Sequence, residues 1–193
     1  MSTIFAYYID SNLENSVSDI EYLKGVYAAA RNKYKPNHIN VVLIAEAPPC
    51  NLDRFFYFED VRVQDSLFLE IMGVLYPEEK QSYLASGRDS SLKADILETF
   101  QQDGYWLLDL SEIPTSLSNA PIESYVPLLI SKLEKSVSKT TPIILIKSNV
   151  YDSCYKPLKA KGFNVVNERL PFPGSGQQKV FREKFQRAIQ STC

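Results

Sequence analysis

The sequence predicts a single α/β domain of three layers, in which a four-stranded parallel sheet lies between two layers of helices. The 193-residue chain is 45% hydrophobic, which suffices for one substantial core. Short apolar runs bounded by turn residues are typical of strands buried on both faces. Helical patterns separate these runs, and connections of that length join parallel strands. We therefore take residues 1–193 as one domain.

The central strand is expected at residues 40–45, where the run VVLI ends at the stiff turn AEAPP. An amphipathic helix precedes it at 17–34, with Ser18 as its cap. A second helix begins near Asp65 and ends before Pro77. The remaining elements expected are helices at 91–102, 122–137, 150–161 and from about 175, and strands at 105–110, 142–147 and 163–167.

Composition limits the functional classes. The formal net charge is −2, so the chain has no global attraction to a polyanion, and nucleic-acid binding needs a local basic patch. The N-terminus has no leader-like pattern and no apolar run approaches the roughly 20 residues of a membrane span, so we expect a cytoplasmic protein that does not bind membranes. The three cysteines, Cys50, Cys154 and Cys193, lack CxxC spacing and are expected to be free thiols. We expect no metal and no cofactor.

Polar residues follow the expected strands at their carboxyl ends. Glu46 follows the central strand, Asp109 lies at the end of the next one, and residues 147–149 and 170–176 follow the last two. The carboxyl ends of parallel strands lie at one edge of the sheet, which is where open α/β sheets bind ligands. We expect these four places to converge.

Three of the strand ends carry a resemblance to the uracil-DNA glycosylase superfamily. AEAPP at 45–49 resembles the family's first motif, especially the GEAPG of its thermostable iron-sulfur branch. GYWLLDL at 104–110 resembles the strand GVLLLNA, and LPFPGS at 170–175 resembles the second motif, HPSPLS. The order is that of the family and covers about residues 40–185. The resemblance implies an α/β/α fold and excision of a damaged or deaminated base from DNA.

The first motif and the strand motif each supply a candidate residue. In the family, the first motif positions water near the sugar carbon, which the resemblance assigns here to Glu46, because Ala47 stands where the best-known branch has Asp. The family reads the base edge with an Asn, and Asp109 falls at that position. An ionised Asp only accepts hydrogen bonds, so it suits a base bearing an exocyclic amine better than uracil.

The second motif departs most from the family. Its His stabilises charge on the departing base, a form of electrostatic catalysis, but here the position is Leu170. The only histidine, His38, lies before the central strand at the opposite end of the sheet and is expected to be a surface or capping residue. The branch's iron-sulfur cluster needs four cysteines, so we expect none here.

The resemblance also implies a stacking aromatic and a loop that contacts DNA. Among the consecutive aromatics at 55–58, Phe58 is nearest the expected spacing for stacking on a flipped base. The alternative is that this aromatic stretch only covers the sheet edge. The DNA-contact loop would comprise Pro171, Phe172, Gly174 and Ser175. Its alternative is a structural strand-to-helix turn, and the basic residues of the last helix (Lys179, Arg182, Lys184, Arg187) are expected on a solvated face.

Two functions from different classes follow. One is a DNA glycosylase that uses Glu46, Phe58 and Asp109. The other is a catalytically degenerate protein of the same fold that binds a small nucleobase-like ligand or a protein partner. A basic rim around the strand ends, made by Arg54, Arg62, Arg88 or Lys147, would favour DNA.

Overall fold

The computed structural model of the chain describes residues 17–192. The α-helices are α1 (Val17–Lys33), α2 (Ser66–Leu75), α3 (Pro77–Ala85), α4 (Ser90–Gln102), α5 (Val126–Ser136), α6 (Ser148–Ala160) and α7 (Gln178–Gln190). The strands are β1 (Val41–Ala45), β2 (Tyr105–Asp109) and β3 (Ile143–Leu145), and short 3-10 helices are η1 (Thr115–Leu117), η2 (Ile122–Tyr125) and η3 (Pro173–Ser175). None of the helices in this range is both long and apolar enough to span a membrane.

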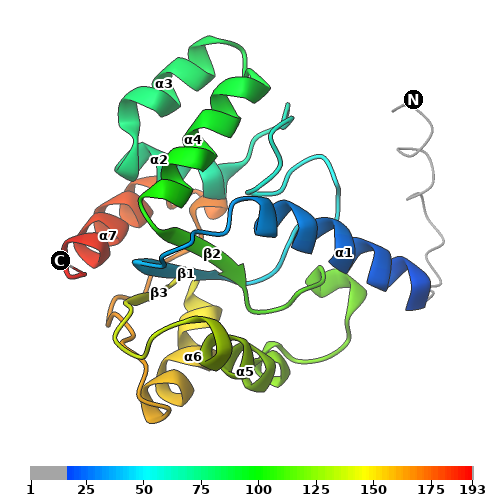
Figure 1. The fold of residues 1–193 in the computed structure, drawn as a ribbon, viewed down its shortest axis with the longest axis vertical. Coiled ribbons are helices and arrows are strands. Elements are labelled where there is room, and N and C mark those ends of the chain that lie inside the picture. The colour runs from blue at the N-terminus through cyan, green and yellow to red at the C-terminus, as the bar shows by residue number, and fades with distance from the viewer. Residues whose placement is uncertain (1–16, 193) are drawn as a thin grey trace.

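The strands form a parallel sheet in the order β2-β1-β3 (Figure 1). In the register, Val42 of β1 pairs with Trp106 of β2 and with Ile143 of β3. The crossovers between the strands run through α2, α3 and α4 on one side and through α5 on the other (Figure 1). This arrangement confirms a mixed α/β fold with a parallel sheet.

The expected fourth strand at 163–167 is reduced to a single parallel bridge between Val165 and Ile143. Ile143 donates to the carbonyl of Asn164 at 2.8 Å and accepts from the N–H of Val166 at 2.9 Å. The N–H of Asn164 bonds instead to the carbonyl of Lys139, at 3.0 Å. Because the N–H groups of Asn164 and Val165 bond outside the ladder and only that of Val166 bonds to β3, the sheet has three strands among the described residues.

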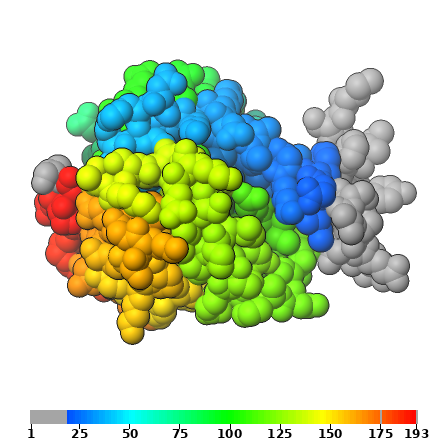
Figure 2. Space-filling view, turned by 60° about the horizontal axis from the view of Figure 1, so that its bottom comes forward, coloured from blue at the N-terminus to red at the C-terminus, as the bar shows by residue number. Residues whose placement is uncertain are grey.

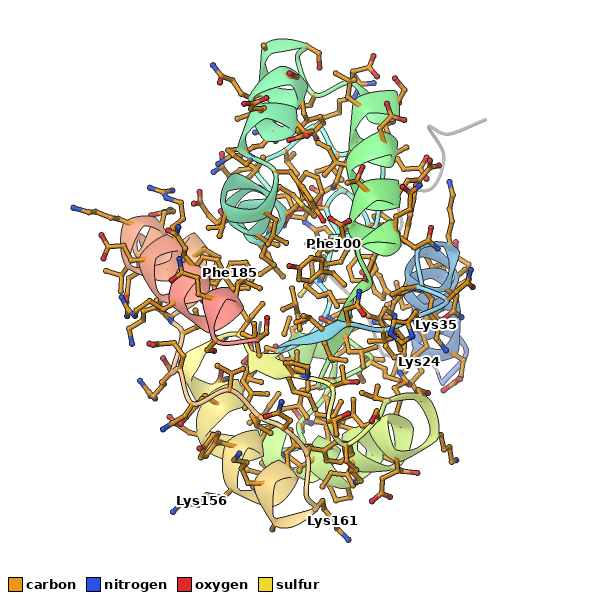
Figure 3. The ribbon with its side chains drawn as sticks, turned by 60° about the vertical axis from the view of Figure 1, so that its left-hand side comes forward. Lys24, Lys35, Phe100, Lys156, Lys161 and Phe185 are labelled. Carbon is orange, nitrogen blue, oxygen red and sulfur yellow. The ribbon has the colours of Figure 1, made fainter. Side chains whose placement is uncertain are left out.

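Side chains of β1 alternate between two cores, one on each face of the sheet. Leu43 joins the larger core, which also contains residues of α1, α2, α4 and α7, whereas Val42 and Ile44 join a second core with α5 and α6. Phe100 and Phe185 both point into the space between their helices and the sheet (Figure 3). Figure 2 brings forward the side of the molecule that carries the second core, where α5 and α6 form the surface and α1 lies beside them. A strand enclosed in this way accounts for the uninterrupted apolar run of β1.

The aromatic stretch after β1 covers the free edge of the sheet. Because β2 is an edge strand, the backbone groups of Leu107 that point away from β1 need partners. The hydroxyl of Tyr57 supplies both: it accepts from the Leu107 N–H at 2.8 Å and donates to the Leu107 carbonyl at 3.1 Å. Tyr57 is 1% exposed, so these bonds are shielded from water. Tyr57 therefore covers the edge of the sheet, which is the structural alternative stated for this aromatic stretch.

Candidate functional site

Glu46 lies at the carboxyl edge of the sheet and binds two residues that follow β3. One of its carboxylate oxygens accepts a hydrogen bond from Lys147 Nζ and the other accepts from Asn149 Nδ2. The Asn149 Oδ1 accepts from the N–H of Val150 at 2.9 Å, which fixes the orientation of the amide. The structure thus brings Glu46 together with residues 147–149, as expected from the strand ends, and holds its carboxylate in one orientation.

Lys147 occupies a strained backbone conformation in the turn between β3 and α6. Its φ is 84° and its ψ is 138°, in a region that residues with a Cβ rarely adopt. Such a conformation costs on the order of 1–3 kcal/mol and is found mostly at functional sites. The Lys147 side chain is 35% exposed, and its Nζ lies 5.8 Å from the centre of the Phe172 ring. The ammonium therefore lies between Glu46 and the loop that follows residue 170.

A cavity of about 410 Å³ lies at the same edge. Its wall is made by the turn after β1, the aromatic stretch, the start of α2, the end of β2 and the loop before η3. The lining side chains with aromatic or charged groups are Arg54, Phe55, Phe56, Asp65, Asp109 and Phe172. Ala47, directly after Glu46, is also part of the wall. The cavity therefore joins apolar rings, which suit a planar ligand, with a few charged groups.

Asp109 contributes a buried carboxylate to the cavity wall. Its Oδ2 accepts a hydrogen bond from Arg31 Nη2 at 2.8 Å, and the two side chains are only 3% and 5% exposed. Burial raises the pKa of Asp109, while the guanidinium of Arg31 acts in the opposite direction. Asp109 also lines a second cavity of about 440 Å³ beside α5. The ion pair occupies one carboxylate oxygen and leaves the other as an acceptor.

Asp65 is the second carboxylate of the wall, and it too has a buried basic partner. Its Oδ1 caps α2 by accepting from the N–H of Phe68 at 3.2 Å, and its Oδ2 lies 3.4 Å from Lys93 Nζ. Lys93 is fully buried, and its ammonium lies 4.2 Å from the centre of the Phe68 ring. Burial lowers the pKa of Lys93 to about 8.

When the buried bases behind the cavity wall are counted with it, one positive charge is left without an acidic partner among the described residues, that of Arg54. Each of the wall's two carboxylates is matched by a buried base, whereas Arg54 makes no ion pair with any residue in the range 17–192. Of the other residues considered for a basic rim, Lys147 pairs with Glu46, Arg62 pairs with Asp60 at 2.7 Å, and Arg88 does not line the cavity. Arg54 is thus the rim residue best placed to meet an anionic group.

The structure does not place Phe58 in this cavity. Its ring stacks on Tyr27 with centres 5.9 Å apart and lines a different hollow beside Glu59. Phe55 and Phe56 face the cavity instead. Spacing from the first motif does not tell consecutive aromatic residues apart, because their directions depend on how the loop turns.

The loop at 170–176 forms one wall of the cavity. Leu170 is fully buried in the core and Pro171 is buried as well, so neither is available to a ligand. Phe172 is 38% exposed and lines the cavity together with Gly174. Ser175 ends the short helix η3. Of the residues expected to contact DNA, Phe172 and Gly174 are thus the ones that line the cavity.

Several other expected residues lie away from the site. His38 is exposed before β1, at the other end of the sheet. Three basic residues of α7 pair with acids: Arg182 with Glu70, and both Lys184 and Arg187 with Glu168. These ion pairs agree with the expectation that the basic residues of α7 lie on a solvated face of that helix.

Cysteine chemistry does not contribute to the cavity. Cys50 is exposed, with its Sγ 2.8 Å from the Oγ of Ser116. Cys154 is buried, which raises the pKa of its thiol to about 12, and Cys193 lies outside the described residues. Within residues 17–192, no group of three or more His, Cys, Asp and Glu side chains is arranged to hold a metal ion.

Sequence reasoning missed Arg31, Lys93 and Asp65. Each belongs to an amphipathic helix or its cap, where a charged residue ordinarily faces solvent, and Arg31 lies 78 residues from its partner Asp109. The three-residue spacing of Asp65 from Phe68 is a capping signal that predicts the start of α2 but not a cavity wall. No protein-family model matches the chain, no curated protein matches its sequence and no solved structure matches its fold.

Proposed function

We propose that the chain hydrolyses the N-glycosidic bond of a damaged or deaminated base in DNA. The observation that carries the proposal is the cavity at the carboxyl edge of the sheet, which combines aromatic rings with a buried carboxylate directly beside the turn that bears Glu46. The resemblance of the strand ends to the uracil-DNA glycosylase superfamily supports the same reaction. A flipped base is recognised in this way, by stacking and by polar groups at its edge.

In this proposal each group has a definite role. The base lies against the exposed ring of Phe172, while Phe55 and Phe56, each 3% exposed, form the apolar wall beside it, and the open oxygen of Asp109 accepts from an exocyclic amine. Glu46 orients a water molecule toward the sugar carbon, and its carboxylate stabilises positive charge that develops on the sugar. A carboxylate oxygen has room for a further hydrogen bond beside the one it receives from Lys147 or Asn149. Arg54 meets a phosphate at the rim.

A second candidate is a protein of this shape that binds a nucleobase-like ligand or a protein partner without chemistry. The observation that favours it is the burial of Leu170, which leaves no side chain at that position to stabilise a departing base. The Asp109–Arg31 pair also serves stability independently of any ligand.

Single-turnover excision separates the two candidates. The substrates are duplex and single-stranded oligonucleotides with uracil, hypoxanthine, xanthine or a mismatched base, and Glu46→Gln is the key variant because it keeps the size of the side chain. We expect wild type to remove one of these bases and Glu46→Gln to lose activity by at least about 100-fold. Asp109→Asn should shift the preference toward uracil, since an amide donates as well as accepts.

The outcomes have distinct meanings. Excision that Glu46→Gln does not affect would contradict the mechanism. No excision, combined with binding of a free nucleobase by isothermal titration, would favour the second candidate. Lys156→Gln, on the exposed side of α6, is the control for loss of a polar surface contact.

A further inference from the structure

We propose that Lys147 is a catalytic residue that stabilises the negative charge on the departing base, the task for which Leu170 has no polar group. The inference rests on the proposed function. It assigns Lys147 to the leaving group and Glu46 to the attacking water. Two observations point to this lysine: its ammonium group binds Glu46, and its backbone has a positive φ that, among the described residues other than glycine, only Arg88 shares.

The ammonium is held beside the cavity from two sides. It donates to the Glu46 carboxylate and lies 5.8 Å from the centre of the Phe172 ring, which itself lines the cavity. An ammonium has three donor hydrogens, and Glu46 uses one of them. At 35% exposure the side chain is accessible, so a ligand that covers Phe172 can receive a hydrogen bond from it.

The backbone at Lys147 has a conformation that is strained for any residue with a side chain. A residue with φ of 84° and ψ of 138° in a tight strand-to-helix turn is the ordinary place for glycine. A lysine there costs on the order of 1–3 kcal/mol of strain. The Lys147–Glu46 pair is partly buried, with side chains 35% and 23% exposed, and a pair of this kind contributes on the order of 1 kcal/mol, which does not exceed that cost.

Within the described part of the chain, the other cations near the cavity are Arg31, Lys93 and Arg54, and none of them contacts Glu46. Arg31 and Lys93 are buried behind the wall, where each is bound to a carboxylate. Arg54 lines the cavity from the aromatic stretch, on an exposed part of the wall, and is not bound to Glu46. Lys147 is not itself part of the cavity wall, but among residues 17–192 it is the cation that binds Glu46 and also lies against the cavity-lining ring of Phe172.

The reaction balances with these groups. The bond between the sugar carbon and the base nitrogen breaks, and its electron pair moves onto the base. The base anion accepts a hydrogen bond from Lys147. The water oxygen forms the new bond to the sugar carbon, and the proton that the water loses passes to Glu46. The same proton is available for the base anion when the products leave, so no oxidant, reductant or co-reactant is needed.

The test compares a poor and a good leaving group. Single-turnover rates are measured for the base that wild type removes and for a more acidic analogue of it, such as uracil and 5-fluorouracil, with wild type, Lys147→Gln and Lys147→Arg. We expect Lys147→Gln to lose about 100- to 1,000-fold on the parent base, the usual effect of removing one such donor. The loss should be at least about tenfold smaller on the acidic analogue, because the anion of a more acidic base is stable without a hydrogen bond from the lysine. Lys147→Arg should recover part of the rate.

A merely structural role gives a different pattern. If Lys147 only holds Glu46, then Lys147→Gln slows both bases by the same factor, and this result would overturn the inference while leaving the proposed function intact. A wild-type protein that removes no base would overturn both. Lys156→Gln, whose side chain projects away from the body of the molecule, controls for loss of a positive charge (Figure 3).

Discussion

Buried charges at the cavity wall come in matched pairs. An unpaired ion in a protein interior costs several kcal/mol, so Asp65 and Asp109 persist there only because Lys93 and Arg31 lie against them. The two pairs differ in chemistry. Arginine keeps its proton in any protein environment, whereas burial shifts the pKa of a lysine readily. Of the two buried bases, Lys93 is therefore the one whose charge changes with pH.

The stability of the protein should depend on the protonation of Lys93. Burial lowers its pKa from 10.5 to about 8, so between these values the unfolded chain binds a proton that the folded chain lacks. The unfolding free energy therefore rises with pH in this window. Below pH 8 the folded protein bears the full cost of burying the charged Lys93. Relative to Lys93→Met, wild type should gain about 2 kcal/mol of unfolding free energy between pH 7.5 and pH 9.5.

Urea denaturation at several pH values measures this difference. Subtracting the curve of Lys93→Met removes the contributions of the tyrosines, which are common to both proteins. Lys156→Met serves as the control for loss of an exposed lysine. If the stability curves of wild type and Lys93→Met run parallel from pH 7.5 to pH 9.5, Lys93 does not titrate in this range.

At the scale of elements, the ends of helices and the edge of the sheet depend on single residues. Pro77 was expected to end the helix that contains α2, and it does follow the end of that helix, but it is also the first residue of α3. The sequence did not predict α3, since proline suits both the residue after a helix and the first helical turn. Only Tyr83 of α3 is buried, so the helix carries little apolar pattern.

The edge of β2 gives a prediction at this scale. Tyr57→Phe removes the hydroxyl that bonds both backbone groups of Leu107 and leaves a buried N–H and a buried C=O without partners. Each unsatisfied group costs about 1–3 kcal/mol, so the variant should lose roughly 2–6 kcal/mol of unfolding free energy. The amide of Leu107 should also exchange its hydrogen faster in the variant.

Tyr22→Phe is the matched control, because Tyr22 is 58% exposed on α1. It should leave the unfolding free energy within about 0.5 kcal/mol of wild type. Equal stabilities of Tyr57→Phe and wild type would mean that a water molecule or a shifted loop can satisfy Leu107.

At the scale of the whole molecule, the sequence predicts the layers better than the site. The apolar run of β1 and the helical spacing of the flanking segments depend on burial, which leaves a direct pattern in the sequence. The position of Glu46 at a strand end is predicted for the same reason. Its contact with Lys147 joins residues 101 apart, and the choice of Phe55 over Phe58 depends on the path of a loop. These details follow from tertiary packing and have no local signal.

The Arg31–Asp109 pair should connect α1 energetically to the end of β2. Arg31→Met leaves a buried carboxylate without its partner and should cost about 3–5 kcal/mol, whereas Arg31→Met combined with Asp109→Leu removes both charges. The double variant should therefore be more stable than the sum of the single variants predicts, by at least about 2 kcal/mol. The single tryptophan, Trp106 in β2, is 3% exposed and reports unfolding by fluorescence. Additive losses within about 0.5 kcal/mol would show that the pair does not couple the two elements, and that α1 is held by its apolar contacts and its other polar contacts, such as the Tyr27 hydroxyl on the Pro49 carbonyl.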